Sequence, residues 1–265
     1  VDVEQLAGIG IGVPGALNLE KGVLIDSPNL GWHDLAISRE LKKRFGVKTT
    51  VLNDVDAGVY GEYARGAAQN ARCVLGVFPG TGIGGGCVYD GGLITGGERS
   101  CLEIGHLPTV LNGARCGCGR RGCLETVASR LAISSQAAVA AYRGEAPNLL
   151  EAAGCDISNI RSGVLAKAIE AGDEIIERII RDAAAWLGFG IASAVNLLAP
   201  DVVLLGGGLT EAMPDLYREE VGAALERHIM PAYEGTYRIE IAQLGDDAVA
   251  TGAAGWARRR KEEKE

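Results

Sequence analysis

Apolar residues alternate along this chain between two spacings, one typical of strands and one typical of helices. "LAGIGIGVPGAL" (6–17) predicts a strand that runs into a Gly-Pro turn, and "KTTVLND" (48–54) predicts a β-branched strand that ends in two polar residues. "DLAISRELKKRFG" (34–46) places apolar and charged residues at helical spacing, and the small-residue segment 55–68 predicts a second helix. The first quarter of the chain therefore mixes strands and helices.

The same alternation continues to the end of the chain. Segment 72–94 predicts a hairpin of strands joined by glycine-rich turns, and 124–200 is mainly helical with a polar break near 144–162. "DVVLLGGGL" (201–209) predicts a short buried strand, 214–230 an amphipathic helix, and the remainder a strand, a loop and a closing helix. We therefore predict an α/β protein, in which ligands bind at the carboxyl ends of the strands, with a domain boundary near residue 72.

The segment 183–200, "AAAWLGFGIASAVNLLAP", carries no charged residue, and its length is near the lower limit for a membrane span. It contains two glycines, a serine and an asparagine, and Asp182 and Asp201 bound it directly. We therefore expect a buried helix, and no membrane as a partner.

The amino-acid composition limits which kinds of partner and which cellular compartment we expect. The 265 residues are 47% hydrophobic, which is enough for one large or two small cores. A net charge of −8 argues against nucleic acid as the default partner but allows a small phosphorylated ligand. Seven cysteines without a leader-like start predict a reducing, cytoplasmic compartment without disulfides.

Asp54 stands at the end of the predicted strand 48–54, directly after Asn53. A carboxylate in this place can accept the proton of a substrate hydroxyl, the general-base role in phosphoryl transfer, and Asn53 could orient the same substrate. An Asn-Asp pair is also a common cap for a following helix, and the pair taken alone favours that structural interpretation.

Two glycine-rich turns follow predicted strands. "GTGIGGG" (80–86) lets the backbone approach phosphate oxygens closely, but it has neither the Lys-Ser/Thr ending of a Walker loop nor the following helix of a Rossmann loop. The hydroxyl of Thr81 favours a phosphate loop over a plain hairpin turn. "LLGGGL" (204–209) is explained equally well by a tight turn. The pair predicts a nucleotide site formed by Gly80, Thr81, Gly82, Gly206, Gly207 and Gly208.

Cys116, Cys118 and Cys123 lie within eight positions, and nine residues separate the first of them from His106. One histidine and three cysteines form the ligand set of a closed tetrahedral zinc site, and neighbouring arginines favour thiolates. A disulfide fits poorly because three cysteines leave one over, and free cysteines are a weak explanation for a glycine- and arginine-rich loop. The spacing therefore predicts structural zinc on His106, Cys116, Cys118 and Cys123.

Two glutamates flank this predicted metal loop. Glu103 precedes His106 by three positions, and Glu125 follows Cys123 by two. A fixed metal loop would hold both carboxylates where they could accept hydrogen bonds from the hydroxyls of a polyol. Ordinary surface glutamates explain the pair equally well.

These pieces, in this order, resemble the ROK family of bacterial sugar kinases and sugar-responsive repressors, and the resemblance covers nearly the whole chain. "EIGH" (103–106) followed by "CGCGRRGCLE" (116–125) is the most specific part. "GVPGAL", "LNDVDA", "GTGIGGG" and "LLGGGL" stand where that family has them. The resemblance implies an actin-like (ribonuclease H-like) fold of two lobes with a sugar in the cleft.

The resemblance also implies domains and residue roles. Residues 1–72 and the closing helix 248–265 would form the small lobe, and 73–247 the large lobe with the zinc loop. Asp54 would be the base that activates a sugar hydroxyl, and His106 would bind zinc through one ring nitrogen and face the sugar with the other. The sugar would be held by Asn29, Asn53, Asp54, Glu103, His106 and Glu125.

Two features depart from the family pattern. The family's kinases open with a strand that carries an Asp-Gly-Gly-Thr phosphate loop, which has no match here, so we expect the small lobe to be truncated at its N terminus. Family repressors carry a DNA-binding helix-turn-helix in that place, so a nucleic-acid partner is expected only if such a region precedes Val1. In "SCLEIGH", Leu102 replaces a smaller residue and could reshape the sugar pocket.

The leading hypothesis is an ATP-dependent hexokinase, with glucose as the first substrate to test, Mg²⁺ accompanying ATP, and zinc in the metal loop. ATP and polyphosphate both stay open as the phosphoryl donor. The alternative hypotheses are a sugar-sensing transcriptional regulator whose DNA-binding part lies outside this sequence, and a binding domain without activity. We also expect a homo-oligomer, because most soluble oligomers are symmetric assemblies of one chain.

Overall fold

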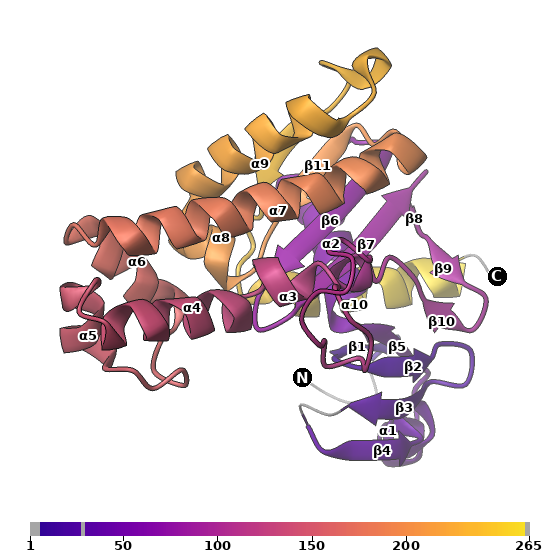
Figure 1. Ribbon diagram of the computed structural model, residues 1–265. Coiled ribbons are helices and arrows are strands. Elements are labelled where there is room, and N and C mark those ends of the chain that lie inside the picture. The colour runs from indigo at the N-terminus through magenta and orange to yellow at the C-terminus, as the bar shows by residue number, and fades with distance from the viewer. Residues whose placement is uncertain (1–5, 28–29, 263–265) are drawn as a thin grey trace. The chain divides into compact units, whose positions relative to one another are not determined.

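The computed structural model describes residues 6–27 and 30–262 (Figure 1). The chain forms two compact units, unit 1 and unit 2. Unit 1 comprises Val1–Gly76, Gly85–Leu102 and Ala242–Glu265, and unit 2 comprises Val77–Gly84 and Glu103–Ile241. The lobes at 1–72, 73–247 and 248–265 stay a prediction from the sequence.

Unit 1 is built on a parallel pair of strands, in which β1 (Ile9–Val13) lies beside β5 (Thr49–Asn53) with Val13 opposite Asn53. The chain between them forms the antiparallel sheet β2-β3-β4, and helix α1 follows it. The apolar core of this part includes Leu17, Leu24 and Val51. The other elements of unit 1 are β2 (Ala16–Asn18), β3 (Val23–Ser27), β4 (Trp32–Leu35), α1 (Ile37–Phe45), α2 (Asp54–Arg65), β8 (Gly92–Leu93), β9 (Thr95–Gly96), β10 (Arg99–Ser100) and α10 (Asp247–Glu262).

Helices α2 and α10 pack closely against each other in unit 1. A Cβ atom at Gly252 would lie 1.7 Å from the carbonyl oxygen of Ala57, so only glycine allows the two helices to approach this far. Glu62, fully buried on α2, accepts backbone hydrogen bonds from Ala67, Gln243 and Leu244 at 2.8, 2.7 and 2.7 Å. This carboxylate ties α2 to the segment that leads into α10.

Unit 2 is mainly helical around strands β11 and β12, which pair in parallel. Strands β6 (Cys73–Pro79) and β7 (Ile83–Tyr89) run through both units, and the sheet order is β12-β11-β6-β7-β8. The long helix α7 packs beside α9 and also contacts α3 and α4 (Figure 1). The elements of unit 2 are the 3-10 turn η2 (Ile104–His106), α3 (Glu125–Ala128), α4 (Arg130–Tyr142), α5 (Pro147–Ala153), α6 (Ser162–Glu170), α7 (Glu174–Leu198), β11 (Val202–Leu205), α8 (Gly208–Ala212), α9 (Pro214–His228), η3 (Pro231–Tyr233) and β12 (Arg238–Ile241).

The predicted α/β class and the alternation of strands and helices are confirmed. The pattern gives no prediction for the meander β2–β4 or the hairpin β9–β10, whose strands are too short to show a clear alternation of apolar and polar residues. The polar break at 144–162 contains α5, which the pattern misses.

The uncharged segment 183–200 lies largely in α7, as expected, and one side of that helix is deeply buried. Within the described ranges, none of the helices combines the length and hydropathy that a bilayer crossing requires.

Candidate functional site

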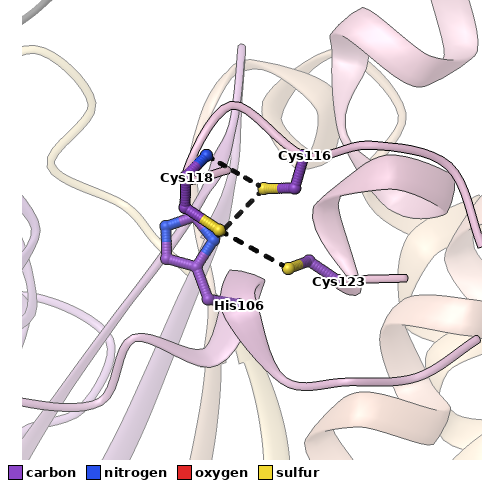
Figure 2. A group of neighbouring side chains, drawn as sticks. All are labelled: His106, Cys116, Cys118 and Cys123. Carbon is purple, nitrogen blue, oxygen red and sulfur yellow. Dashed lines mark hydrogen bonds between the residues drawn. The ribbon is translucent and has the colours of Figure 1, made fainter. Parts of the chain in front are cut away.

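The four predicted metal ligands meet at one point in unit 2 (Figure 2). Their ligand atoms all lie within 4.8 Å of one another. Sγ of Cys118 is 3.7 Å from Sγ of Cys123, and Sγ of Cys116 is 3.6 Å from Nδ1 of His106. Ordinary zinc–ligand lengths in a tetrahedron place two sulfurs about 3.8 Å apart, and a sulfur and a nitrogen about 3.5 Å apart. The cluster thus has the size of a tetrahedral metal site.

Local backbone pairing brings these ligands together. Leu124 donates its N–H to the carbonyl of Leu107 at 2.9 Å, and an isolated bridge joins Pro108 to Cys123, which sets the turn η2 with His106 beside the last cysteine. The N–H of Cys116 bonds to the carbonyl of Arg120 at 2.8 Å and closes the tight turn that carries Cys118. These backbone contacts fold the segment into a loop that brings the four ligand residues together.

The thiols of the cluster differ in their protonation. Burial raises the pKa of Cys116, and its hydrogen bond to Glu125 adds to the effect, whereas the backbone N–H of Arg120 lowers the pKa of the exposed Cys118. All seven cysteines of the chain are free. A site that offers three thiols and one imidazole suits a thiophilic cation such as zinc.

Glu125 lies at the edge of this cluster, at the start of α3. Its Oε1 accepts a 2.8 Å hydrogen bond from Sγ of Cys116 and lies 3.8 Å from Nδ1 of His106. Glu103 is exposed and directly precedes η2. The structure thus joins Glu125 directly to the metal cluster and brings Glu103 to the same turn as His106.

The first glycine turn lies directly beside Glu125. A Cβ atom at Gly82 would be 2.8 Å from Oε2 of Glu125, so a glycine lets the loop approach the carboxylate. The turn is held by α4, because Arg130 donates its backbone N–H to the carbonyl of Gly80 at 2.8 Å and its Nη2 to Oγ1 of Thr81 at 2.6 Å.

The two glycine turns are neighbours in unit 2. Gly207 has a φ of +82° and would place a Cβ 2.9 Å from the carbonyl oxygen of Pro79, directly before Gly80. A Cβ at Gly206 would meet the ring of Phe78 at 2.8 Å. Gly208 begins α8, and the hydroxyl of Ser162 lies 3.5 Å from the position of its Cβ.

A pocket of about 560 Å³ opens beside these turns and includes residues that the sequence patterns missed. Two cationic side chains and two serine hydroxyls line it together with Thr81, which suits an anionic ligand. The members outside the glycine turns are Arg130, Leu131, Ile157, Ser158, Arg161, Ser162 and Gly163. No motif marks them, since they come from α4, α6 and the loop between α5 and α6, and only the fold brings them to Thr81.

Asp54 lies in unit 1 as the first residue of α2, half-buried. Burial raises the pKa of its carboxyl, and a hydrogen bond from the N–H of Val55 at 3.1 Å partly opposes that shift. Asn53 caps the same helix, because its Oδ1 accepts from the N–H groups of Val55 and Asp56 at 2.9 and 3.4 Å. The capping interpretation of Asn53 is therefore correct.

Two further predictions concern single residues. Asn29 lies outside the described residues. Leu102 has a φ of +61°, a conformation that favours glycine and that side chains such as leucine adopt rarely. The backbone just before Glu103 is therefore strained, and the effect of Leu102 on the sugar pocket stays a prediction from the sequence.

Known proteins are similar to this chain over nearly its whole length. A model of the ROK family matches residues 2–260. Glucokinase from Thermotoga maritima is 35% identical over 257 residues, which cover 96% of this chain and 80% of the relative. The DNA-binding transcriptional repressor Mlc from Escherichia coli is 29% identical over 253 residues, or 95% of this chain and 61% of the repressor.

Among solved structures, a ROK family glucokinase from Streptomyces griseus, in complex with glucose and AMPPNP, superimposes with a TM-score of 0.85. The two chains are 29% identical, and the match covers 96% of this chain and 82% of the other. The predicted actin-like sugar kinase fold is confirmed by this similarity.

Proposed function

Because this chain belongs to the ROK family, we propose that it transfers the γ-phosphoryl group of ATP to a hydroxyl of a hexose, with glucose as the first substrate to test. The relative from Thermotoga maritima is named a glucokinase, and the similar structure from Streptomyces griseus holds glucose and an ATP analogue. Both support a sugar kinase rather than another class of enzyme.

One observation in unit 2 carries the proposal. The turn at Gly82 approaches the carboxylate of Glu125 so closely that a Cβ atom would lie 2.8 Å from Oε2. A phosphoryl donor on the glycine turns and a sugar hydroxyl on Glu125 would therefore be neighbours, as phosphoryl transfer requires. A protein that only senses a sugar does not need a phosphoryl donor next to the carboxylate that binds the sugar.

The proposed residues divide into those that bind the sugar, those that bind the phosphates and one that accepts the proton. In unit 2, Glu103, His106 and Glu125 would accept or donate hydrogen bonds to sugar hydroxyls. The glycine turns would present backbone N–H groups to the phosphates, and Arg130 and Arg161 would neutralise phosphate charge. In unit 1, Asp54 would take the proton of the attacking hydroxyl, and its raised pKa makes it a better base than an ordinary aspartate.

Two metals enter the proposal in different roles. Zinc on His106, Cys116, Cys118 and Cys123 would fix the loop that carries Glu125, and it would supply rigidity to the sugar site. Mg²⁺ would accompany ATP and offset the charge of its phosphates. The thiolate ligand set also suits a reducing compartment, so we place the protein in the cytoplasm.

The decisive experiment compares Asp54→Asn with the complete wild-type protein. Hexose-dependent release of ADP should fall at least a hundredfold, because a general base contributes roughly 10²–10⁴ to the rate, while glucose affinity measured by calorimetry should change little. Asp34→Asn, an exposed aspartate of the same unit, is the matched control. Full turnover by Asp54→Asn would disprove the assignment of the base, and no ADP release from wild-type protein with any hexose would disprove the kinase. Polyphosphate in place of ATP tests the donor.

A sugar-sensing regulator is the second candidate, because the repressor Mlc matches 95% of this chain and is considerably longer. A regulator would need the sugar carboxylates and the metal loop but not Asp54. Sugar-dependent binding of the complete protein to operator DNA, without consumption of ATP, would favour this second function.

A further inference from the structure

Unit 1 contains a cavity that shares no residue with the sites proposed above. It measures about 260 Å³, which is below the range of about 300–1,000 Å³ for pockets that hold drug-sized ligands. Its walls come from the turn between β2 and β3, the start of α1, strand β5, the hairpin β9–β10 and helix α10. The cavity therefore has room for a ligand that is smaller than a nucleotide.

One edge of strand β5 forms a wall of this cavity. Four consecutive residues, 49–52, line it, and because successive side chains of a strand point to opposite faces, four in a row meet a cavity only along the strand's edge. Ile9 of β1 donates its N–H to the carbonyl of Lys48 at 2.9 Å. Backbone groups alternate between the two edges of a strand, so the N–H groups of Thr49 and Val51 point away from β1. Across the described ranges β5 pairs with β1 alone, which leaves those N–H groups to a ligand.

Residues that carry hydroxyl groups lie along this edge, and one of the hydroxyls is buried without a partner. Thr49 is 6% exposed, and its Oγ1 has no hydrogen-bond partner in residues 6–27 and 30–262. Ser38 of α1 donates its hydroxyl to the carbonyl of Thr49 at 2.7 Å. Thr50 on the same strand and Thr95 on β9 also line the cavity. Because a buried hydroxyl without a partner is costly, a polar ligand that bonds to Thr49 would be stabilised here.

The charged and aromatic side chains of the cavity point to the chemistry of that ligand. Lys48 and Arg260 bring two positive charges to its lining, against one negative charge from Glu20. Arg260 follows Trp256 by one turn of α10, so the two side chains lie on the same face of the helix. Trp256 packs edge-on against Tyr60, with 5.1 Å between the ring centres. The positive balance favours an anion, and an indole beside hydroxyl groups favours a ligand with both apolar and polar faces.

We propose that this cavity binds a small phosphorylated polyol. Its phosphate would be held by Lys48, Arg260 and the N–H groups on the edge of β5, and its hydroxyls by the threonine side chains beside Trp256. A neutral sugar would not use the two cations, and a bare phosphate would not use the indole ring. The site itself does not depend on the proposed function. The choice of a hexose phosphate as the first ligand to test does, because it is the product that a hexose kinase would release.

Trp256 allows binding to be measured without turnover. In the complete protein, the double substitution Trp32→Phe/Trp186→Phe leaves Trp256 as the one tryptophan of these 265 residues. Glucose is present throughout, so that the proposed sugar site stays occupied. Titration with glucose 6-phosphate should then change the fluorescence of Trp256 until the site is saturated, and inorganic phosphate should bind about tenfold more weakly. No change with glucose 6-phosphate would overturn the proposal, and equal affinity for the two ligands would disprove recognition of the polyol.

Substitution of Lys48 tests the site of the phosphate. Lys48→Ala in the same background should raise the dissociation constant of glucose 6-phosphate about tenfold, as for the loss of one charge-assisted hydrogen bond. Lys43→Ala, an exposed lysine of α1 outside the cavity, is the matched control and should leave the constant unchanged. Equal constants for the two variants would show that glucose 6-phosphate binds elsewhere.

Thr49→Val separates a role in binding from a role in folding. It replaces the unpartnered hydroxyl by a methyl group, so the melting temperature should not fall, whereas the dissociation constant of glucose 6-phosphate should rise. A variant that binds like the wild type would show that this hydroxyl does not contact the ligand and would overturn the proposed geometry. Asp54→Asn should bind glucose 6-phosphate at this cavity as the wild type does, so failure of the proposed kinase and failure of this site are separate results.

Discussion

Oε1 of Glu125 lies 2.8 Å from Sγ of Cys116, so the proposed sugar-binding carboxylate is a direct neighbour of a proposed metal ligand. As a thiol, Cys116 donates a hydrogen bond to this carboxylate. A metal-bound thiolate has no proton to donate, so metal binding would free Oε1 for a sugar hydroxyl.

Removing the metal should therefore weaken sugar binding. We expect metal analysis to find about one zinc ion per chain in fresh protein, and chelation to lower glucose affinity about tenfold, since a hydrogen bond to a charged group contributes about 1.5–3 kcal/mol. Calorimetry with glucose before and after chelation measures the effect. Cys118→Ser should act like chelation, and Cys155→Ser, an exposed cysteine outside the cluster, should have no effect. Unchanged affinity in protein verified to lack metal would contradict this coupling.

Gly82 offers a test of the contact between the phosphate loop and the sugar carboxylate. In Gly82→Ala the new methyl group would lie 2.8 Å from Oε2 of Glu125 and force that side chain to move. We expect the KM for glucose to rise about tenfold, as for the loss of one charge-assisted hydrogen bond.

Gly80→Ala is the matched control in the same turn, because nothing lies within 4 Å of the position of its Cβ. Its KM for glucose should stay at the wild-type value, whatever happens to the KM for ATP. Equal effects of the two substitutions on glucose would mean that the loop, and not its contact with Glu125, determines sugar affinity.

The sequence made the metal cluster predictable because its four ligands lie close together along the chain, and a short loop could bring them to one point. Asp54 and the glycine turns were predictable as candidates because each stands at the end of a strand, where α/β proteins bind ligands. Arg130, Arg161 and Ser162 carry no such mark. They reach Thr81 only through the packing of helices far apart in the sequence.

The alternation of apolar and polar residues did not predict the short strands. β2, β3 and β4 have three to five residues each, and a shift in register between Ala16 and Leu17 further disturbs their alternation. The close contact of Gly82 with Glu125 was equally hidden, because a glycine turn does not reveal what approaches it. Contacts between residues far apart in the sequence were therefore harder to predict than local conformation, because a local pattern does not show them.

Glu62 should contribute strongly to the stability of unit 1. Its buried carboxylate accepts three backbone hydrogen bonds, and Glu62→Gln would turn one acceptor into a donor that faces another N–H group. We expect the free energy of unfolding, measured with urea, to fall by about 3 kcal/mol. Glu151→Gln, on an exposed position of α5, should change it by less than about 0.5 kcal/mol. Similar values for the two variants would mean that water replaces the buried contacts.

Asp54 should make both turnover and folding stability depend on pH, with opposite signs. As the pH rises, turnover should increase and stability should decrease. Its pKa is raised by burial, so turnover, which needs the carboxylate, should fall as the pH drops through that raised value. Between the unfolded pKa of about 3.9 and the raised folded value, the folded state binds more protons than the unfolded state. Asp54 therefore makes the protein less stable as the pH rises through this window.

Asp54→Asn removes that charge and should raise the melting temperature at neutral pH while it abolishes turnover. The gain in melting temperature should shrink as the pH is lowered towards 4, because the wild-type carboxyl is then protonated and costs little to bury. Thermal melts of wild type, Asp54→Asn and Asp34→Asn across this pH range measure the difference. An Asp54→Asn variant that is less stable than wild type at neutral pH would mean that the hydrogen bond from Val55 outweighs the cost of burying the charge.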